Sequence, residues 1–471
     1  MKMLRLIPLA VAFVVLSSTG TVRAQSSDLD PRLVKLLQTI SEDRMAATLK
    51  KVESFGTRNT LSSADKPDRG IGAARRWIFD ELKSYNPKLQ VSFDTYLLAK
   101  QGRIFRDVEV RNIIAMLPGR TARRIYVSGH YDSVARSGGQ SSANASGSMF
   151  RDPDAPAVPP ADPNAPLDNP APGVNDDGSG VALTMELART FSQSGLDFEA
   201  TLIFMCHVGE EQGLFGARLH AQKAAAEKIR IDAVLNNDIV GGDRGGNGIV
   251  DGATIRVYSE GPEDSPSREV ARFVQRWGGR YVPSHRVRLM ARPDRFGRGG
   301  DHSAYNQAGF AAVGFRESRE NFSRQHDPRD TFEGISLPYL AQNARVNAAA
   351  AATLALAPPA PVVTNERGQP TISRQPTGYD ADLRWRAVPG AAAYRIFWRE
   401  AWGPDWQHDL LVGNVTEIVL PNIQLDDYVF GVAAIDAQGH ESLVSPYLAP
   451  TRPNTPVKTL PAVSSAASDR S

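Results

Sequence analysis

The sequence has a single cysteine, Cys206, so it can form no internal disulfide even in an oxidising compartment. Cys206 stands inside an apolar run, where we expect a small buried core residue rather than a reactive thiol. The chain also has no surplus of charge, because 54 lysines and arginines face 52 aspartates and glutamates. A formal net charge of +2 indicates neither nucleic acid nor an anionic membrane surface as a partner.

No apolar run after the N-terminus is long enough to span a membrane. The N-terminus has the parts of a signal peptide: a basic region with Lys2 and Arg5, an apolar core over residues 6–16, and a small-residue cleavage site at residues 22–24. We therefore predict that residues 1–24 are a signal peptide and that the protein is periplasmic or extracellular. An uncleaved N-terminal membrane anchor is the alternative.

Helix-like and strand-like segments alternate through most of the chain. Apolar spacing predicts helices at residues 31–53, 71–85, 181–191, 267–277 and 337–356. Apolar runs predict strands at residues 111–117, 123–129, 200–206, 232–240, 254–260 and 311–317. The alternation indicates an α/β domain over residues 25–357, with a mostly parallel mixed sheet and helices on both faces. In such sheets the functional site lies at the carboxyl ends of the strands.

Four segments depart from this alternation. Residues 135–172 are rich in Ala, Ser, Pro, Gly and Asp without periodicity, which predicts a long insertion, either a lid or an idle surface loop. Residues 358–370, which begin with Pro-Pro-Ala-Pro, are predicted to be a linker. Short alternating strands over residues 371–450 predict a small all-β sandwich. Residues 451–471 are rich in Pro, Ser and Ala, and we expect a disordered tail.

Metal-ligating residue types stand at the ends of apolar runs or in the loops after them. They are His130 in SGHYDS, Asp176 in GVNDDGSG, Glu210 and Glu211 in HVGEEQGLFGA, Asp238 in LNNDIVG and His326 in RQHDPRDT. Two neighbouring carboxylates at the end of a strand are costly to place together without a cation. Imidazoles and carboxylates in this number suit a pair of zinc ions with an activated water.

The residues divide into two ligand sets with one shared member. Asp176 is the best candidate for the bridge, since Gly178 and Gly180 allow tight backbone turns around it. One zinc would then take His130 and Asp238, and the other Glu211 and His326. Glu210 stays free as the general base. Asp132, two residues after His130, is positioned to orient its ring.

Each of these residues also has a purely structural interpretation. His130 or His326 taken alone would more often be structural or an exposed loop residue. Asp176 and Asp238 are also good turn and cap residues, and the glutamate pair could be a solvated helix start. Their occurrence together, in the order that a two-metal site needs, favours the metal-site interpretation.

The motifs GHYDS, NDDGSG, GEEQGLFGA, NNDIVG and HDPRDT together resemble the secreted di-zinc aminopeptidase family, whose wider relatives include glutamate carboxypeptidase and glutaminyl cyclase. The resemblance covers roughly residues 40–356. It implies a zinc exopeptidase fold and two zinc ions per chain. It also implies a hydroxide shared by the metals, which attacks the peptide bond next to a substrate's N-terminus. The ligand and base roles given above match the family's motifs, and Asp132 matches its carboxylate behind the histidine.

Some positions depart from the family pattern. The insertion replaces a short connection, Gln325 stands where some relatives have tyrosine, and Gly300 stands where relatives often have serine. The segment GGDHSAY, with Asp301 and His302, resembles a motif that lines the site. Arg316 and Glu317, at the end of a predicted strand, are candidates for binding the charged end of the substrate.

Two alternative functions are compatible with the same sequence. A carboxypeptidase or a glutaminyl cyclase-like enzyme would use the same fold, and cyclase relatives use one zinc. An inert peptidase-like binding protein is more remote, because all six metal and base positions are filled. The C-terminal segment resembles a fibronectin type III domain through Trp385, Tyr394, Tyr428 and DAQGHES, which suggests a spacer or a contact surface for a partner.

Overall fold

The computed structural model describes residues 29–135 and 169–448 of the 471. The predicted signal peptide, residues 136–168 of the predicted insertion and the predicted tail lie outside the described residues. Among the helices that are described, none combines the length and the apolarity needed to cross a bilayer. Export and the tail therefore stay predictions.

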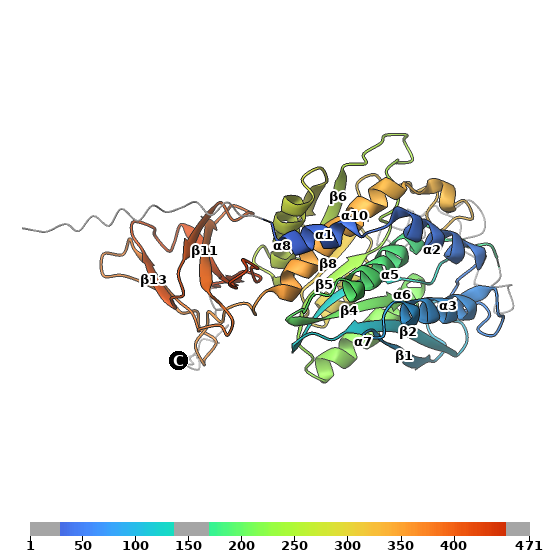
Figure 1. Ribbon diagram of the computed structural model, residues 1–471, viewed down its shortest axis with the longest axis horizontal. Helices are drawn as coiled ribbons and strands as arrows, with labels where there is room; N and C mark the ends of the chain where they lie inside the picture. Colours follow the sequence, from blue (N-terminus) through green and yellow to red (C-terminus); the bar gives the residue numbers. More distant parts are fainter. Residues whose placement is uncertain (1–28, 136–168, 449–471) are drawn as a thin grey trace, which may run out of the picture.

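A mixed sheet forms the main body, as predicted, and it has eight strands where the sequence predicted six (Figure 1). Its strand order is β1-β2-β4-β3-β5-β8-β6-β7. Strands β4, β3, β5 and β8 run parallel to one another at the centre, whereas β1, β2 and β6 pair antiparallel with a neighbour. The strands are β1 (Gln90–Leu98), β2 (Val108–Leu117), β3 (Thr121–His130), β4 (Ala200–His207), β5 (Ile231–Asn237), β6 (Thr254–Ser259), β7 (Arg286–Met290) and β8 (Ala312–Glu317).

Helices cover both faces of this sheet. The helices are α1 (Pro31–Gln38), α2 (Glu42–Ser54), α3 (Gly70–Tyr85), α5 (Gly178–Gln193), α6 (Glu210–Gly213), α7 (Phe215–Ala226), α8 (Pro266–Tyr281), α9 (Asp301–Gln307) and α10 (Leu337–Leu356), with a short 3-10 turn η1 (Phe332–Gly334). The single helix predicted over residues 31–53 is in fact α1 and α2. Ser41 is extended and its side chain accepts a hydrogen bond from the Arg44 N–H, so it caps a new helix.

Alternation along the central strands divides the core between the two faces. Ile125 and Val127 of β3 join the larger cluster under α1, α2, α3, α5, α8 and α10, whereas Tyr126 joins the smaller cluster under α7 and α9. Cys206 is fully buried in the larger cluster, and burial raises the pKa of its thiol. The prediction of a small buried core cysteine is confirmed.

The C-terminal segment forms two small antiparallel sheets beside the main body (Figure 1). One contains β9 (Ile372–Arg374), β10 (Ala381–Arg384) and β13 (Glu417–Leu420); the other contains β11 (Ala393–Glu400), β12 (His408–Val412), β14 (Tyr428–Ile435) and β15 (Ser445–Pro446). The two sheets share an apolar core in which the rings of Trp385 and Tyr394 lie 5.3 Å apart between centroids. The fibronectin type III identity of this C-terminal segment, its boundaries and a partner for it stay predictions.

Helix α8 joins the C-terminal sheets to the main body through buried charged groups. Arg272 of α8 donates to the Pro404 carbonyl across the interface, with its Nε 2.8 Å from that oxygen, and to Glu269 on its own helix at 2.5 Å. Glu269 in turn accepts a hydrogen bond from the Trp406 indole at 3.0 Å. Arg399 of β11 pairs with Asp264 just before α8. The two units are therefore fixed against each other by a connected polar network.

Replacing Arg272 by methionine is expected to lower the free energy of unfolding by about 3 kcal/mol, because Glu269 stays buried without its cation. Glu269 is 4% exposed, so solvent cannot compensate for the loss. Urea denaturation measures the effect. Arg288→Met, which removes an exposed arginine from β7, is the control and should change stability by less than about 0.5 kcal/mol. Equal losses in the two variants would contradict this account of the interface.

Candidate metal centre and active site

The six predicted ligand and base residues meet at the carboxyl edge of the parallel strands. They come from five separate positions: His130 ends β3, Asp176 precedes α5, Glu210 and Glu211 open α6 just after β4, Asp238 follows β5, and His326 lies in the loop after β8. Residues that are far apart in the sequence converge there because adjacent parallel strands end on the same side of a sheet. The predicted grouping is therefore present in the structure.

The Asp176 carboxylate lies between two ligand groups. Its Oδ1 is 3.4 Å from His130 Nε2, and its Oδ2 is 3.1 Å from His326 Nε2. His130 Nε2 is also 3.7 Å from Asp238 Oδ1, and His326 Nε2 is 3.0 Å from Glu211 Oε2. Within each group, one ligand atom from each residue lies within 4.8 Å of the others, and Asp176 belongs to both groups.

Buried atoms without hydrogen-bond partners provide a test of whether these residues fit zinc. His130 Nε2, Asp176 Oδ2, Glu211 Oε1 and Asp238 Oδ1 all lack a hydrogen-bond partner although they are buried. Buried polar atoms are almost always paired, so four orphans in one place need an explanation. They are one imidazole nitrogen and three carboxylate oxygens, which are donor types that zinc takes. The donor set therefore fits zinc.

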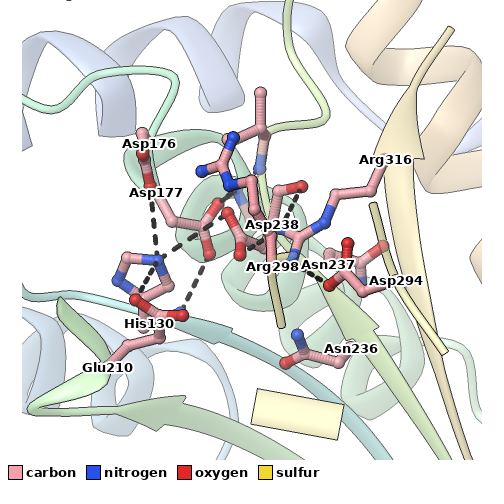
Figure 2. A network of polar contacts seen from close by, with 12 residues as sticks. His130, Asp176, Asp177, Glu210, Asn236, Asn237, Asp238, Asp294, Arg298 and Arg316 are labelled. Carbon is pink, nitrogen blue, oxygen red and sulfur yellow. Dashed lines mark hydrogen bonds and ion pairs between the residues drawn. The ribbon is translucent and has the colours of Figure 1, made fainter. Parts of the chain in front are cut away.

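Glu210 lies beside the two groups and belongs to neither. Its Oε2 is 3.9 Å from His130 Nε2 (Figure 2), and its side chain, which is 14% exposed, lines a cavity. Burial raises the pKa of the Glu210 carboxyl, and Glu211 adds to that rise while His130 opposes it. A carboxyl group with a raised pKa at a cavity wall is suited to accept and release a proton.

Asp132 holds the backbone of both glutamates. Its Oδ1 accepts the Glu210 N–H at 3.3 Å, and its Oδ2 accepts the Glu211 N–H at 3.2 Å. The ring of His130 is nearer to the Asp132 carbonyl, at 3.1 Å from Nδ1, than to the carboxylate, at 3.6 Å. The Asp132 carboxylate thus orients the two glutamates, whereas the His130 ring, for which it was predicted, is held by the Asp132 carbonyl.

Two further aspartates, not singled out from the sequence, fix the loops that carry the ligands. Asp177 accepts the His130 N–H at 2.9 Å and the Gly180 N–H at 2.8 Å, so it ties β3 to the start of α5. Asp330 accepts the N–H of Asp176 at 2.9 Å. Asp177 lies within the motif NDDGSG and Asp330 within HDPRDT. Their place in these motifs was the only sequence feature that could have indicated a role at the site.

The close packing around Asp177 explains a glycine of the NDDGSG motif. A Cβ at Gly180 would lie 2.2 Å from the Asn237 carbonyl oxygen and 2.5 Å from Asp177 Oδ2. A side chain there would push α5 away from the end of β5. The ligand loop can therefore approach the sheet only with glycine at this position.

Arg316 and Glu317 do not line the cavity, so they differ from their predicted role in substrate binding. Arg316 is fully buried, pairs with the Asp238 carboxylate, and donates to the Asp238 carbonyl at 2.9 Å and to Asp294 at 3.0 Å. It holds Asp238 from behind (Figure 2). Glu317 is 1% exposed and accepts hydrogen bonds from Asn175 and the Gly242 N–H, facing a separate cavity. Their position at the end of a strand predicted that both residues lie near the site, but not the direction in which each side chain points.

Asp301 and His302 also lie behind the cavity wall. His302 Nε2 is 2.8 Å from the Pro293 carbonyl. Neither carboxylate oxygen of Asp301 has a hydrogen-bond partner, and burial, together with nearby Asp132 and Asp238, raises its pKa to about 8. A Cβ at Gly300 would lie 2.4 Å from Arg316 Nη2, which leaves no room for the serine that relatives often have there.

A cavity of about 390 Å³ opens beside the two ligand groups. Its wall includes Asp176, Glu210, Glu211, Asp238 and His326, together with Arg103 and Arg298, which no sequence motif indicated. His326 has a positive φ of 54°, an uncommon conformation for a residue other than glycine. The groups that can bind a metal, move a proton and contact a substrate therefore share one cavity.

Comparisons with known proteins agree with this site. The profile of peptidase family M28 matches residues 112–351. A protein of Pyricularia oryzae described as a probable zinc metalloprotease is 35% identical over 462 residues, covering 89% of this chain and 85% of its own length. Both comparisons span every candidate ligand.

Two solved structures share the fold at low sequence identity. The LapA aminopeptidase of Legionella pneumophila is 18% identical, with a TM-score of 0.51 over 69% of this chain and 75% of its own. The glutaminyl cyclase of Porphyromonas gingivalis is 17% identical, with a TM-score of 0.50 over 66% and 97%. At these identities the likeness concerns the fold alone.

Proposed function

The chain belongs to peptidase family M28 and is a zinc-dependent peptidase, and from this premise we propose that it is an exported aminopeptidase using two zinc ions. Its substrates are peptides or proteins with a free N-terminus. Support for an aminopeptidase comes from the five ordered motifs, and support for export comes from residues 1–24. N-terminal sequencing of the mature protein tests the cleavage after Ala24.

One observation carries the proposal for two ions: the two carboxylate oxygens of Asp176 face different ligand groups, one oxygen to each group. We propose that His130 and Asp238 hold one zinc, that Glu211 and His326 hold the other, and that Asp176 belongs to both. Bound zinc supplies Lewis acidity, which polarises a carbonyl and makes a bound water acidic near neutral pH.

Side chains of the protein would move the proton and hold the base and the ligands in position. Glu210 takes the proton of the attacking water and passes it to the leaving amine. Asp132 fixes the direction of Glu210 by accepting its backbone N–H. Arg316 fixes Asp238 through its carboxylate and its carbonyl, so this ligand keeps one oxygen directed away from the arginine.

A glutaminyl cyclase-like enzyme and an inert binding protein are weaker candidates. Cyclase relatives use one zinc, whereas two overlapping ligand groups are present here. An inert relative would be expected to have lost a ligand or the base, and all six positions are filled. A carboxypeptidase differs in which end of the substrate is free, so substrate assays must separate it.

Metal content and activity test the proposal together. Purified protein equilibrated with zinc is expected to hold two ions per chain, measured by plasma mass spectrometry. Chelation should lower the hydrolysis of aminoacyl-arylamides at least about 100-fold, since the water loses its activation, and zinc should restore it. N-blocked peptides with a free C-terminus are the comparison substrates.

Each other result identifies an alternative. One zinc per chain with cyclisation of N-terminal glutamine would support the cyclase. Turnover of the N-blocked peptides alone would support the carboxypeptidase. Protein that takes up no zinc would support the inert binding protein and reject the proposed enzyme.

A further inference from the structure

The charged groups lining the active-site cavity fall into two kinds. One kind consists of the candidate ligands and the base. Once these are set aside, every charged residue that lines the cavity in the described part of the chain is an arginine: Arg103, Arg295 and Arg298. No further carboxylate faces the cavity there to receive a substrate cation. The remaining wall is therefore suited to a negatively charged group.

Arg295 is already neutralised by carboxylates behind the wall. Its Nε is 2.9 Å from Asp294 Oδ1, and its Nη1 is 2.7 Å from Glu320 Oε2. Its side chain is 7% exposed. This arginine supports the wall and has little remaining capacity for a ligand.

Arg298 is held by a neutral amide instead of a carboxylate. Its Nη1 donates to Gln325 Oε1 at 2.7 Å, and the nearest carboxylate oxygen, Glu320 Oε2, is 3.7 Å away. That oxygen already accepts from Arg295 Nη1 at 2.7 Å and from Gln325 Nε2 at 2.9 Å. Burial and the neighbouring Arg295 lower the pKa of Arg298, whereas Glu320 and Asp176 oppose the fall.

Arg298 is also close to the reacting centre. Gln325, which holds it, directly precedes the candidate ligand His326, and Arg298 lines the same cavity as the candidate ligand Asp238. Arg103, in the loop between β1 and β2, lies at the exposed rim and donates from Nη1 to the Glu211 carbonyl at 2.8 Å. No ion pair of Arg103 is found within the described residues. Two guanidinium groups without a closely bound carboxylate therefore border the cavity.

We propose that Arg298, assisted by Arg103 at the rim, binds a carboxylate of the substrate within one residue of the scissile bond. This inference rests on the proposed peptidase function. A guanidinium presents parallel N–H donors that match the two oxygens of a carboxylate. The amide of Gln325 fixes the arginine in advance, so less side-chain freedom is lost on binding.

Three parts of a short peptide can supply this carboxylate: the side chain of the first residue, the side chain of the second residue, or a free C-terminus. Three matched pairs of dipeptides separate them, each pair differing only by a carboxylate in place of an amide. The pairs are Asp-Ala-amide with Asn-Ala-amide, Ala-Glu-amide with Ala-Gln-amide, and Ala-Ala with Ala-Ala-amide. The zinc-loaded protein should have at least about tenfold higher kcat/KM for the acid in one or more pairs.

Substitutions at Arg298 assign that preference. Arg298→Met should reduce the acid-to-amide ratio toward one, and Arg298→Lys should keep part of it, because the charge stays but the paired donors are lost. Arg292→Met is the matched control: it removes an exposed arginine from the same loop, one that does not line the cavity, and it should keep both the ratio and the activity. Circular dichroism confirms that the variants are folded.

Binding to an inactive variant separates failure of this inference from failure of the proposed function. The Glu210→Gln variant loaded with zinc should bind the preferred acid at least about tenfold more tightly than its amide, measured by calorimetry. That preference should be lost in the double variant with Arg298→Met. This result would support the carboxylate site even if no dipeptide were hydrolysed. Equal kcat/KM and equal affinity for acid and amide in all three pairs would overturn the proposed carboxylate site. A preference for the acid that survives Arg298→Met would overturn it as well.

Discussion

Glu210→Gln is expected to lower kcat/KM for peptide hydrolysis by roughly 10²- to 10⁴-fold, the range that a general base contributes. Glutamine has nearly the same shape but cannot accept a proton at neutral pH. Glu210 belongs to neither ligand group, so the zinc content should stay at two per chain. Its backbone N–H, held by Asp132, is unaffected by the substitution.

Steady-state kinetics and metal analysis of the same sample test this prediction. Glu227→Gln is the control, because it makes the same chemical change at an exposed glutamate just after α7. It should leave both activity and zinc unchanged. A Glu210→Gln protein that turns over peptides at the wild-type rate would show that another group moves the proton. A loss of zinc would instead show that Glu210 is a ligand.

Asp176→Asn is expected to lower the zinc affinity of both sites. The loss should exceed the roughly 10- to 100-fold loss in affinity that follows when a residue that only supports a metal ligand is replaced. The carboxylate offers one oxygen to each group, at 3.4 Å from His130 and 3.1 Å from His326. An amide has only one oxygen and is neutral. Equilibrium dialysis followed by mass spectrometry should therefore find less than one zinc per chain.

Two matched variants make this result specific. Asp238→Asn and Glu211→Gln each alter a residue of one group only, so each should lose one zinc and keep the other. If Asp176→Asn also kept one zinc, the shared role would be refuted. Thermal unfolding of the metal-free proteins separates a loss of ligands from a loss of fold.

The sheet and the ligand set were predictable because their signals are strong and local. Apolar runs marked the central strands, and each ligand followed such a run or lay in the loop beside it. Because parallel strands of one sheet end at the same edge, these ends were expected to meet. Strand β1 was missed although Val91, Phe93 and Leu97 alternate with polar residues, and the seven-residue α9 is too short to show helical periodicity.

The direction of individual side chains could not be predicted in the same way. Arg316 and Glu317 are neighbours at the end of β8, yet one holds Asp238 and the other faces a separate cavity. Alternation along a strand says that they point apart, but not which face carries the site. Arg298 comes from an irregular loop without a periodic signal, so the sequence does not show that it lines the cavity beside Gln325.

The shared carboxylate of Asp176 also has a thermodynamic consequence for the assembly of the centre. With ions in both groups, the position of this one side chain enters both binding equilibria. Whatever factor the first ion changes in the affinity for the second, the second changes in the affinity for the first. A titration of the metal-free protein would thus follow a single cooperative system, with one coupling free energy, in place of two independent isotherms.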